Sequence, residues 1–158
     1  MKTVTLLFLL DKERGQILLA MKKRGFGVGK LNGVGGKVQE GETVPRAAVR
    51  EAHEEIGVTI REEDAVPVAR LHFVFAEHPE WEFDCHVFTA EAWQGEPAES
   101  EEMAPQWHPT DAVPFDQMWI DDVHWLPRVL SGERLEAEFL FGGDGQSILE
   151  QHIVTVSP

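Results

Sequence analysis

The feature that most restricts the fold is a glycine-rich segment followed at once by a strong helix signal. Residues 25–36 read GFGVGKLNGVGG, a composition that disfavours both a helix and a regular strand. Thr43 then offers an N-cap, Pro45 suits the first helical turn, and Gly57 suits the end of the helix. The sequence therefore predicts a loop that leads directly into one helix over residues 44–56.

Short apolar segments elsewhere predict strands around that helix. Val4–Leu10 and Ile17–Met21 flank a charged turn, which is typical of a hairpin with buried strands. Further strand candidates, in chain order, are Val66–Phe75, Asp84–Ala90, Phe139–Phe141 and Ile148–Val156.

The remaining segments predict connections and a second helix. Residues Gln94–Pro105 are expected to form an acidic connection, and Phe115–Leu126 an aromatic loop that enters a helix, with Pro127 just beyond it. Strands around one strong helix, with another helix later, favour an α/β or α+β domain. A chain of 158 residues is expected to form one domain over residues 1–158.

The charge of the chain argues against a nucleic-acid polymer as its partner. The sequence holds 14 Lys+Arg and 28 Asp+Glu, which gives a formal net charge of −14. Proteins that bind duplex DNA or RNA usually present a basic surface instead. A small anionic substrate remains compatible with this charge if local basic groups or metal ions offset it.

Two further observations predict a cytosolic location. The single cysteine, Cys85, cannot form an internal disulfide and is interpreted as a buried, inert thiol. The apolar run within Met1–Leu10 is shorter than a membrane span of about 20 residues, and no small-residue cleavage site follows it. We therefore expect a cytosolic protein that does not contact membranes. A monomer is expected too, although the sequence does not determine the oligomeric state.

Three glutamates give the predicted helix an unusual charge pattern. Glu51, Glu54 and Glu55 are spaced i, i+3, i+4 and converge on one stripe beside the apolar side. Like charges at these spacings cost about 0.2–0.5 kcal/mol per pair, whereas a divalent cation would make the arrangement favourable. A solvated acidic face is the alternative interpretation, and the pattern alone leaves both open.

The glycines before the helix raise the same question. Gly33, Gly35 and Gly36 permit close backbone approach and positive φ, so backbone groups there could face a ligand. A tight loop needed only for folding is the alternative. The segment contains no Gly-Lys-Ser/Thr and is neither a Walker A motif nor a dinucleotide fingerprint.

Loop and helix together match the pattern G-x5-E-x7-R-E-U-x-E-E-x-G-U, in which U is aliphatic. The matching positions are Gly36, Glu42, Arg50, Glu51, Ala52, Glu54, Glu55, Gly57 and Val58. On these residues the chain resembles the Nudix hydrolase family. Ala52 is the one soft departure, because the family usually has a larger aliphatic residue there. The resemblance implies an α/β (α+β) Nudix fold, a mixed β-sheet sandwiched between helices, with residues 36–58 as the loop–helix–loop box.

Further motifs resemble the branch of this family that hydrolyses oxidised purine nucleoside triphosphates. They lie at Met21–Gly27, Asn32–Gly33, Gly35–Thr43, Glu99–Ser100, Glu102–Met103, Met118–Trp119, Asp121–Asp122 and Trp125. The departures are Leu31 and Val34, where that branch has large aromatic residues, and Val123–His124. Leu31 and Val34 border the pocket motif, so they leave the substrate preference open.

The resemblance also implies the metal ligands and the catalytic residues. Mg²⁺ or Mn²⁺ would be held by Glu51, Glu54, Glu55, the carbonyl of Gly35 and the distant Glu102. One of these carboxylates would accept the proton of the attacking water, and the sequence does not decide which. Arg50 is expected to orient the ligand carboxylates, and Glu42 to assist near the start of the helix.

The substrate site that the resemblance implies contains Thr5, Lys22, Phe26, Asn32, Gly35, Gly36, Lys37, Phe73, Trp119, Asp121 and Asp122. Two adjacent carboxyls in a partly dry pocket do not readily both ionise, so the Asp121–Asp122 pair would present a donor and an acceptor to a purine. A helix cap with a first-turn acid is the alternative for that pair. Lys23 and Arg24 are expected to steer the substrate, and Trp125 to pack in the core.

These residues lead to one main hypothesis and two alternatives. The main hypothesis is a Mg²⁺-dependent pyrophosphohydrolase that converts 8-oxo-dGTP or 2-hydroxy-dATP to the monophosphate and pyrophosphate, and so sanitises the nucleotide pool. A Nudix hydrolase of ADP-ribose, a dinucleoside polyphosphate or an unmodified triphosphate is the first alternative. The second is a non-catalytic Nudix-fold sensor, although such proteins typically lack the box carboxylates present here.

Overall fold

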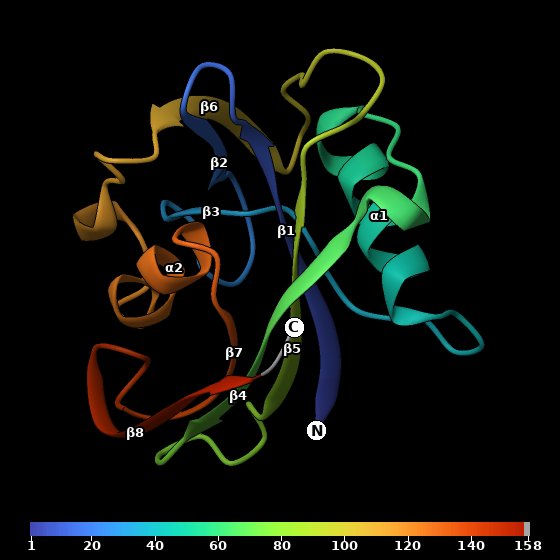
Figure 1. The fold of residues 1–158 in the computed structure, drawn as a ribbon. Helices are drawn as coiled ribbons and strands as arrows, with labels where there is room; N and C mark the ends of the chain where they lie inside the picture. Colours follow the sequence, from blue (N-terminus) through green and yellow to red (C-terminus); the bar gives the residue numbers. More distant parts are fainter. Residues whose placement is uncertain (157–158) are drawn as a thin grey trace.

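The computed structural model describes residues 1–156 (Figure 1). Strands and helices follow one another as β1 (Lys2–Asp11), β2 (Gln16–Lys22), β3 (Leu31–Asn32), α1 (Val44–Ile56), β4 (Val66–Phe75), β5 (Phe83–Ala90), β6 (Met103–Pro109), α2 (Asp122–Leu130), β7 (Arg134–Gly142) and β8 (Ser147–Val156). Short 3-10 turns lie at Glu62–Asp64 and Phe115–Gln117. No helix in the described part of the chain is long and apolar enough to cross a membrane.

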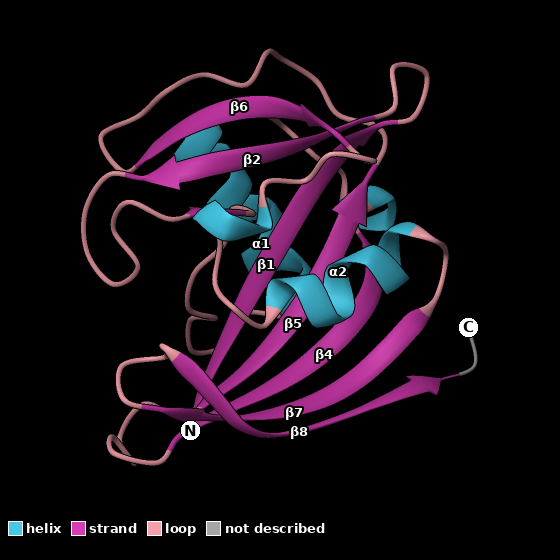
Figure 2. Ribbon diagram, turned by 90° about the vertical axis from the view of Figure 1, so that its left-hand side faces the viewer, coloured by secondary structure: helices cyan, strands magenta, loops and turns pink. Residues whose placement is uncertain are grey.

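The strands form one mixed sheet in the order β3-β2-β1-β5-β4-β7-β8, with β6 paired to β2. β1 runs parallel to β5 and β4 runs parallel to β7, while the other pairs are antiparallel. β2 and β6 run at an angle to the remaining strands (Figure 2). The mixed sheet that the sequence resemblance implied is therefore confirmed.

Each face of the sheet is covered by one helix, because side chains alternate between the two faces of a strand. Leu7 and Leu9 of β1 pack in the core beneath α1, whereas Phe8 and Leu10 pack on the other face with Trp125 of α2. Figure 1 shows the two helices on opposite sides of β1 and β5. The cavity described below is lined by Val4, Thr5 and Leu6 of β1.

Helix α1 has the ends that its sequence predicts. The Thr43 hydroxyl accepts a hydrogen bond from the backbone N–H of Arg46, and Gly57 adopts the left-handed conformation with φ of 76°. Ala52, the small residue of the box, is fully buried with Ala48 against the sheet. A small side chain here allows the helix to approach the sheet closely.

The glycine loop between β3 and α1 lies along an open edge of β1. β2 pairs with β1 only at Leu10 and Asp11, so most of this edge is free of strand pairing. The loop forms hydrogen bonds with this edge instead. The N–H of Leu7 donates to the carbonyl of Val34 (2.7 Å), and the N–H of Thr5 donates to the carbonyl of Gly36 (2.9 Å). These backbone hydrogen bonds fix the loop that precedes α1.

Three glycines of the loop, Gly33, Gly35 and Gly36, are needed for close approach and not for positive φ. A Cβ at Gly35 would lie 1.8 Å from the carbonyl oxygen of Thr5, and one at Gly33 would lie 2.8 Å from that of Leu7. Neither residue, nor Gly36, has positive φ. The close approach that these glycines permit is thus present at Gly33 and Gly35, whereas none of the three adopts the positive φ that glycine also permits.

The structure corrects two other expectations. The segment predicted as an acidic connection over 94–105 runs into a strand, β6, which pairs with all seven residues of β2. Its sequence, MAPQWHP, has no clear alternation, so the pairing partner decides its conformation. Pro127 lies inside α2 and not beyond it, because burial of Trp125, Leu126 and Val129 outweighs the hydrogen bond that proline cannot make.

The smaller differences concern strand ends. β5 begins one residue before the predicted segment, the predicted strand at 139–141 is the end of the longer β7, and β8 begins at Ser147. Cys85 is buried, as expected.

We predict that Gly35→Ala lowers the free energy of unfolding by about 2–4 kcal/mol, because the methyl group collides with the backbone of β1. Urea denaturation of the purified variant measures this loss. Gly41→Asn is the matched control, since Gly41 has φ of 79° and a Cβ there would meet no atom within 4 Å. Asparagine tolerates that conformation, so the control should lose less than about 1 kcal/mol. Equal losses at the two positions would contradict the close-packing argument.

Candidate active site

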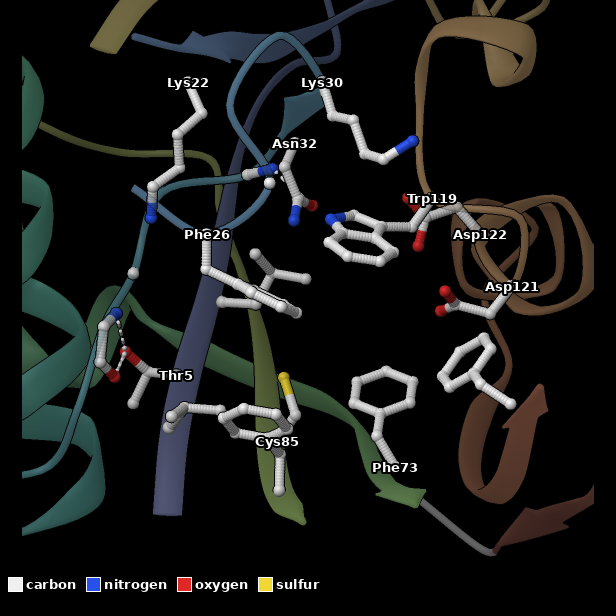
Figure 3. A pocket seen from close by; sticks show the side chains of 18 of the residues that line it. Thr5, Lys22, Phe26, Lys30, Asn32, Phe73, Cys85, Trp119, Asp121 and Asp122 are labelled. Atoms are coloured by element: carbon white, nitrogen blue, oxygen red, sulfur yellow. Dashed lines mark hydrogen bonds between the residues drawn. The ribbon is translucent and has the colours of Figure 1, made fainter. Parts of the chain in front are cut away.

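A cavity of about 210 Å³ opens between the glycine loop, β1 and α2 (Figure 3). Most of the predicted substrate residues line it: Thr5, Lys22, Phe26, Asn32, Gly35, Gly36, Phe73, Trp119, Asp121 and Asp122. Lys37 does not line the cavity; its side chain is exposed and its carbonyl accepts a hydrogen bond from Arg50 (3.1 Å). The fold therefore brings residues from five separate segments into one site.

Aromatic rings form the walls of the cavity. Phe26 stacks on Trp119 with ring centroids 5.2 Å apart and an angle of 23° between the planes. Phe26 is 49% exposed, yet it also contacts the edges of Phe75 and Trp81. A flat, apolar ligand suits these walls, because stacking on aromatic faces adds to the burial of its surface.

Several lining residues were not predicted from the sequence as part of the site: Val4, Leu6, Gly27, Lys30, Phe75, Phe83, Cys85, Met103, Trp125 and Phe141. For some of them a signal existed. Phe75 follows Phe73 by two residues on β4, and Cys85 follows Phe83 by two on β5, so the members of each pair share one face of the sheet. No local signal identifies Lys30. Met103 belongs to a motif named above, but nothing in the sequence placed its side chain at the cavity.

Asp121 and Asp122 are carboxyls buried at one end of the cavity, with 2% and 3% of their surfaces exposed. Asp121 occupies the N-cap position of α2 but makes no side-chain capping bond; its carboxylate accepts a hydrogen bond from the indole N–H of Trp125 (2.8 Å). Among the described residues, Oδ2 of Asp122 has no hydrogen-bond partner. The pair thus stands at the N-cap and in the first turn of α2, as the alternative interpretation had it, but the Asp121 side chain does not cap the helix.

Burial raises the pKa of both carboxyls, and the negative charge of Asp121 raises the pKa of Asp122 further. Two such groups in contact do not both ionise near neutral pH, so the pair retains a proton. It can then offer both a hydrogen-bond donor and an acceptor to a molecule in the cavity.

A second acidic cluster lies at the opposite end of the site, where α1 meets the glycine loop. Glu55 is almost completely buried and accepts a hydrogen bond from the N–H of Gly35 (3.2 Å). Burial raises its pKa to about 8, and the charges of Glu51 and Glu102 raise it in addition. Burial likewise raises the pKa of Glu51. Glu102 directly precedes β6, the strand that pairs with β2, and so joins the cluster from a segment distant in sequence.

Arg50 connects most of this cluster through one guanidinium group. It donates to both carboxylate oxygens of Glu42 (2.7 and 3.0 Å), to Glu51 (2.9 Å) and to Glu54 (3.2 Å). The hydrogen bonds from Arg50 lower the pKa of Glu42 to about 2. Unlike Glu51 and Glu55, Glu54 is exposed, so the three glutamates of the predicted stripe occupy different environments.

The basic residues before the glycine loop divide into two groups. Lys22 lines the cavity and its charge lowers the pKa of Glu55. Lys23 instead donates to Glu99 (2.6 Å) and to the carbonyl of Ser100, and Arg24 pairs with Glu102 (3.3 Å). Lys23 and Arg24 therefore hold the segment before β6 in place.

The sequence model of the NUDIX domain family matches residues 1–129 of the chain. The chain belongs to the Nudix family. It is 44% identical to the zebrafish oxidized purine nucleoside triphosphate hydrolase, over 96% of this chain and 92% of that protein. It is also 44% identical to the mouse protein of the same name, over 87% of this chain and 85% of its relative.

Solved structures agree with this assignment of the fold. A MutT protein from Bacillus halodurans superimposes with a TM-score of 0.81, at 23% identity and with 97% of both chains covered. A MutT Nudix hydrolase from Burkholderia pseudomallei gives a TM-score of 0.63 at 28% identity, over 72% of this chain and 86% of that one. The Nudix fold expected from the sequence is confirmed.

The departures from the Nudix branch named above lie away from the cavity. Leu31 is fully buried in the core beneath α2, and Val34 is buried in the core beneath α1. Neither lines the cavity, and Val123 and His124 are exposed on α2. These differences from the Nudix branch therefore affect core packing or the exposed surface of α2, and none of them changes the residues that line the cavity. Trp125 is fully buried in the core, as expected.

The Nudix box is the candidate site for a divalent cation. Among residues 1–156, no three His, Cys, Asp or Glu side chains are placed to bind one ion together. However, the donor set is all oxygen, and the negative charge of Glu102 raises the pKa of both Glu51 and Glu55. A Cβ at Gly36 would lie 2.7 Å from the Glu51 carboxyl carbon, so this glycine leaves room for that group. The residues present thus fit a hard divalent cation.

We predict that the metal-free protein loses stability as the pH rises from about 4.5 to about 8, in part through Glu55. Its pKa is raised in the folded state, so the folded protein holds a proton that the unfolded chain releases within this window. Each pKa unit corresponds to about 1.4 kcal/mol. Glu55→Gln keeps a hydrogen-bond acceptor for Gly35 and should be the more stable protein at pH 8.

Urea denaturation in the presence of a chelator, repeated across this pH window, measures the effect. Glu40→Gln, at an exposed position outside the cluster, is the control and should follow the wild type. If Glu55→Gln shows the same pH dependence as the wild type, the assignment of the buried proton to Glu55 is wrong.

Proposed function

We propose that this protein hydrolyses oxidised purine nucleoside triphosphates to the monophosphate and pyrophosphate, and so removes them from the nucleotide pool. The observation that carries this proposal is the buried Asp121–Asp122 pair, with one unpartnered oxygen among the described residues, at the end of an aromatic cavity. The names of the zebrafish and mouse relatives support it, since these proteins share 44% of their aligned residues with the chain.

The cavity offers the groups that a modified purine base requires. An oxidised purine differs from the normal base in the donors and acceptors along its edge, and a pair of carboxyls that shares one proton can match both kinds. The amide oxygen of Asn32 accepts from the N–H of Gly33 (2.9 Å), which leaves its NH₂ group as a donor toward the cavity. Phe26, Phe73 and Trp119 supply the faces against which the ring would stack.

The phosphate chain would lie toward α1. Lys22 is placed between the cavity and Glu55 and would contact the phosphates. Mg²⁺ is the cation we favour, with Mn²⁺ as a substitute, and its ligands would be Glu51, Glu54, Glu55, Glu102 and the carbonyl of Gly35. When bound, such a cation supplies positive charge against the phosphates and lowers the pKa of water.

The protein's own residues would then position the reaction and accept a proton. Arg50 holds the carboxylates of Glu51 and Glu54 from one side, so it acts as a positioning residue. Glu55 has a pKa of about 8 without a metal and is one of the carboxyls that could take the proton of the attacking water. Positioning and electrostatics account for most of the rate in phosphoryl transfer.

The two alternative functions receive less support from the structure. A different nucleotide substrate was suggested by Leu31 and Val34, but both residues are in the core. A non-catalytic sensor would not require three box glutamates gathered beside a glycine loop. The cytosolic location, the monomeric state, the single domain over 1–158 and the absence of membrane or nucleic-acid partners stay predictions.

We predict that the protein with Mg²⁺ prefers 8-oxo-dGTP or 2-hydroxy-dATP over dGTP and dATP by at least about 10-fold in kcat/KM, which corresponds to about 1.4 kcal/mol. Anion-exchange chromatography separates pyrophosphate from phosphate and thus identifies the bond that is cleaved. ADP-ribose and diadenosine polyphosphates belong to the same panel. A preference for one of these would keep the hydrolase assignment and overturn the oxidised-purine substrate, whereas nucleotide binding without turnover would favour a sensor.

A second prediction concerns base recognition. Asp122→Asn keeps the size of the side chain but cannot ionise, so it should reduce the preference for oxidised over normal purines by about 10-fold or more. The measurement is kcat/KM for 8-oxo-dGTP and dGTP with the same enzyme preparation. Asp116→Asn removes a carboxylate at an exposed position near α2 and should change neither value. An equal loss on both nucleotides would contradict a role of Asp122 in base recognition.

A further inference from the structure

Lys30 extends over the cavity from the loop before β3. None of the roles assigned above to residues of the site involves its side chain. Its ammonium nitrogen lies 5.2 Å from the centroid of the Trp119 ring (Figure 3). The backbone of Lys30 is fixed at both polar groups: its N–H donates to the carbonyl of Gly27 (3.1 Å), and its carbonyl accepts from the N–H of Lys22 (3.0 Å). The position of this lysine is therefore set by the end of β2.

Trp119 is confined on several sides. Phe26 stacks on the indole, and the ring lies so close to two glycines that a Cβ at Gly27 or Gly145 would approach it to 3.3 or 2.7 Å. In Figure 3 the ammonium of Lys30 approaches the indole from the side away from Phe26. A cation over the face of tryptophan is attracted by the ring's quadrupole, so Lys30 completes the enclosure of Trp119.

Lys30 also balances the charge at the buried end of the cavity. Of the residues that line the cavity, only Lys22 and Lys30 carry cationic side chains. Lys22 acts on Glu55, whereas the positive charge of Lys30 lowers the pKa of Asp122. The other groups that face the acid pair are His124 and Trp125 of α2 and the thiol of Cys85 on β5.

We propose that Lys30 is a specificity-determining residue of the base site, because its ammonium packs on Trp119 and lies beside the Asp121–Asp122 pair. This inference rests on the proposed function. Lys30 acts through Trp119 and the acid pair, so it is a positioning residue. Its loss should weaken binding of an oxidised purine while the chemistry at the box glutamates continues unchanged.

The same arrangement predicts a change with pH. The form of the pair that offers both a donor and an acceptor holds one proton, and the cation favours its ionisation. Without the cation, both protonation steps move to higher pH. The pH range of tightest binding should therefore move upward by about 0.5 pH unit or more when the charge of Lys30 is removed.

Lys30→Met tests this inference, because methionine keeps an unbranched stem and removes the charge. For 8-oxo-dGTP at neutral pH we expect KM to rise about 3- to 5-fold and kcat to stay within about twofold of the wild type. The minimum of KM against pH should shift upward. Lys30→Arg retains a cation that can lie on the indole, so it should restore both KM and the pH profile.

Lys12→Met is the matched control, since Lys12 pairs with Glu91 (3.4 Å) at an exposed position and lies outside the cavity lining. It changes the net charge by the same amount and should leave KM and its pH profile unchanged. Thermal unfolding of all variants shows whether they are equally folded, and Lys30→Arg provides a test even if Lys30→Met is destabilised.

Three outcomes would overturn the inference. An unchanged KM and pH profile in Lys30→Met excludes a role at the base site. An equal rise in KM for 8-oxo-dGTP and ATP, with no pH shift, means that Lys30 only attracts phosphates. A wild-type protein that shows no preference for oxidised purines overturns the proposed function itself and this inference with it, so the wild type is measured first.

Discussion

The site depends on the contact between the glycine loop and the edge of β1. β2 leaves β1 after two paired residues, and the loop makes the hydrogen bonds that a neighbouring strand would otherwise make. This substitution is possible only because Gly35 carries no side chain where it meets the carbonyl of Thr5. The loop in turn presents the N–H of Gly35 to the carboxylate of Glu55 on α1. A shift of this contact would move the box glutamates and the cavity wall together.

The protein is strongly acidic, and its two internal acidic clusters are stabilised in different ways. The cluster at α1 includes Arg50, whose guanidinium contacts three glutamates, and it lies near the charge of Lys22. The pair at α2 has no arginine; it is buried among aromatic rings and keeps a proton instead. A group that is neutralised by a proton can form hydrogen bonds with a neutral base, whereas a group that stays ionised attracts a cation. The environment of the pair at α2 thus suits hydrogen bonding to a base, whereas the environment of the cluster at α1 suits binding of a cation.

The sequence predicts those parts of the fold that local interactions determine. The bounds of α1 follow from Thr43 and Gly57, and β4 matches its predicted range, because caps and alternation act over a few residues. β6 was missed because its conformation depends on β2, more than 80 residues earlier in the chain. Pro127 was misplaced because tertiary burial of its neighbours outweighs a local rule.

The same distinction applies to the site. Motif resemblance identified the acid pair and the glutamates, but it assigned no role at the site to Lys30 or Met103, which line the cavity in the folded chain. Leu31 and Val34 show the reverse error, since proximity to a motif in sequence did not place them in the site.

The glycine loop also sets the distance between the two ends of the substrate. Asn32 faces the base end of the cavity, and Gly35, three residues later, contacts Glu55 at the other end. Three residues of extended chain span about 10 Å, which leaves room for a sugar between a base and its phosphates. Asn32 pairs with Ala20 of β2, and the chain around Gly35 is bridged to β1 at Val34 and Lys37, so the sheet sets this spacing and neither helix does. Recognition of the base and hydrolysis at the phosphates can therefore be kept in register by one backbone segment.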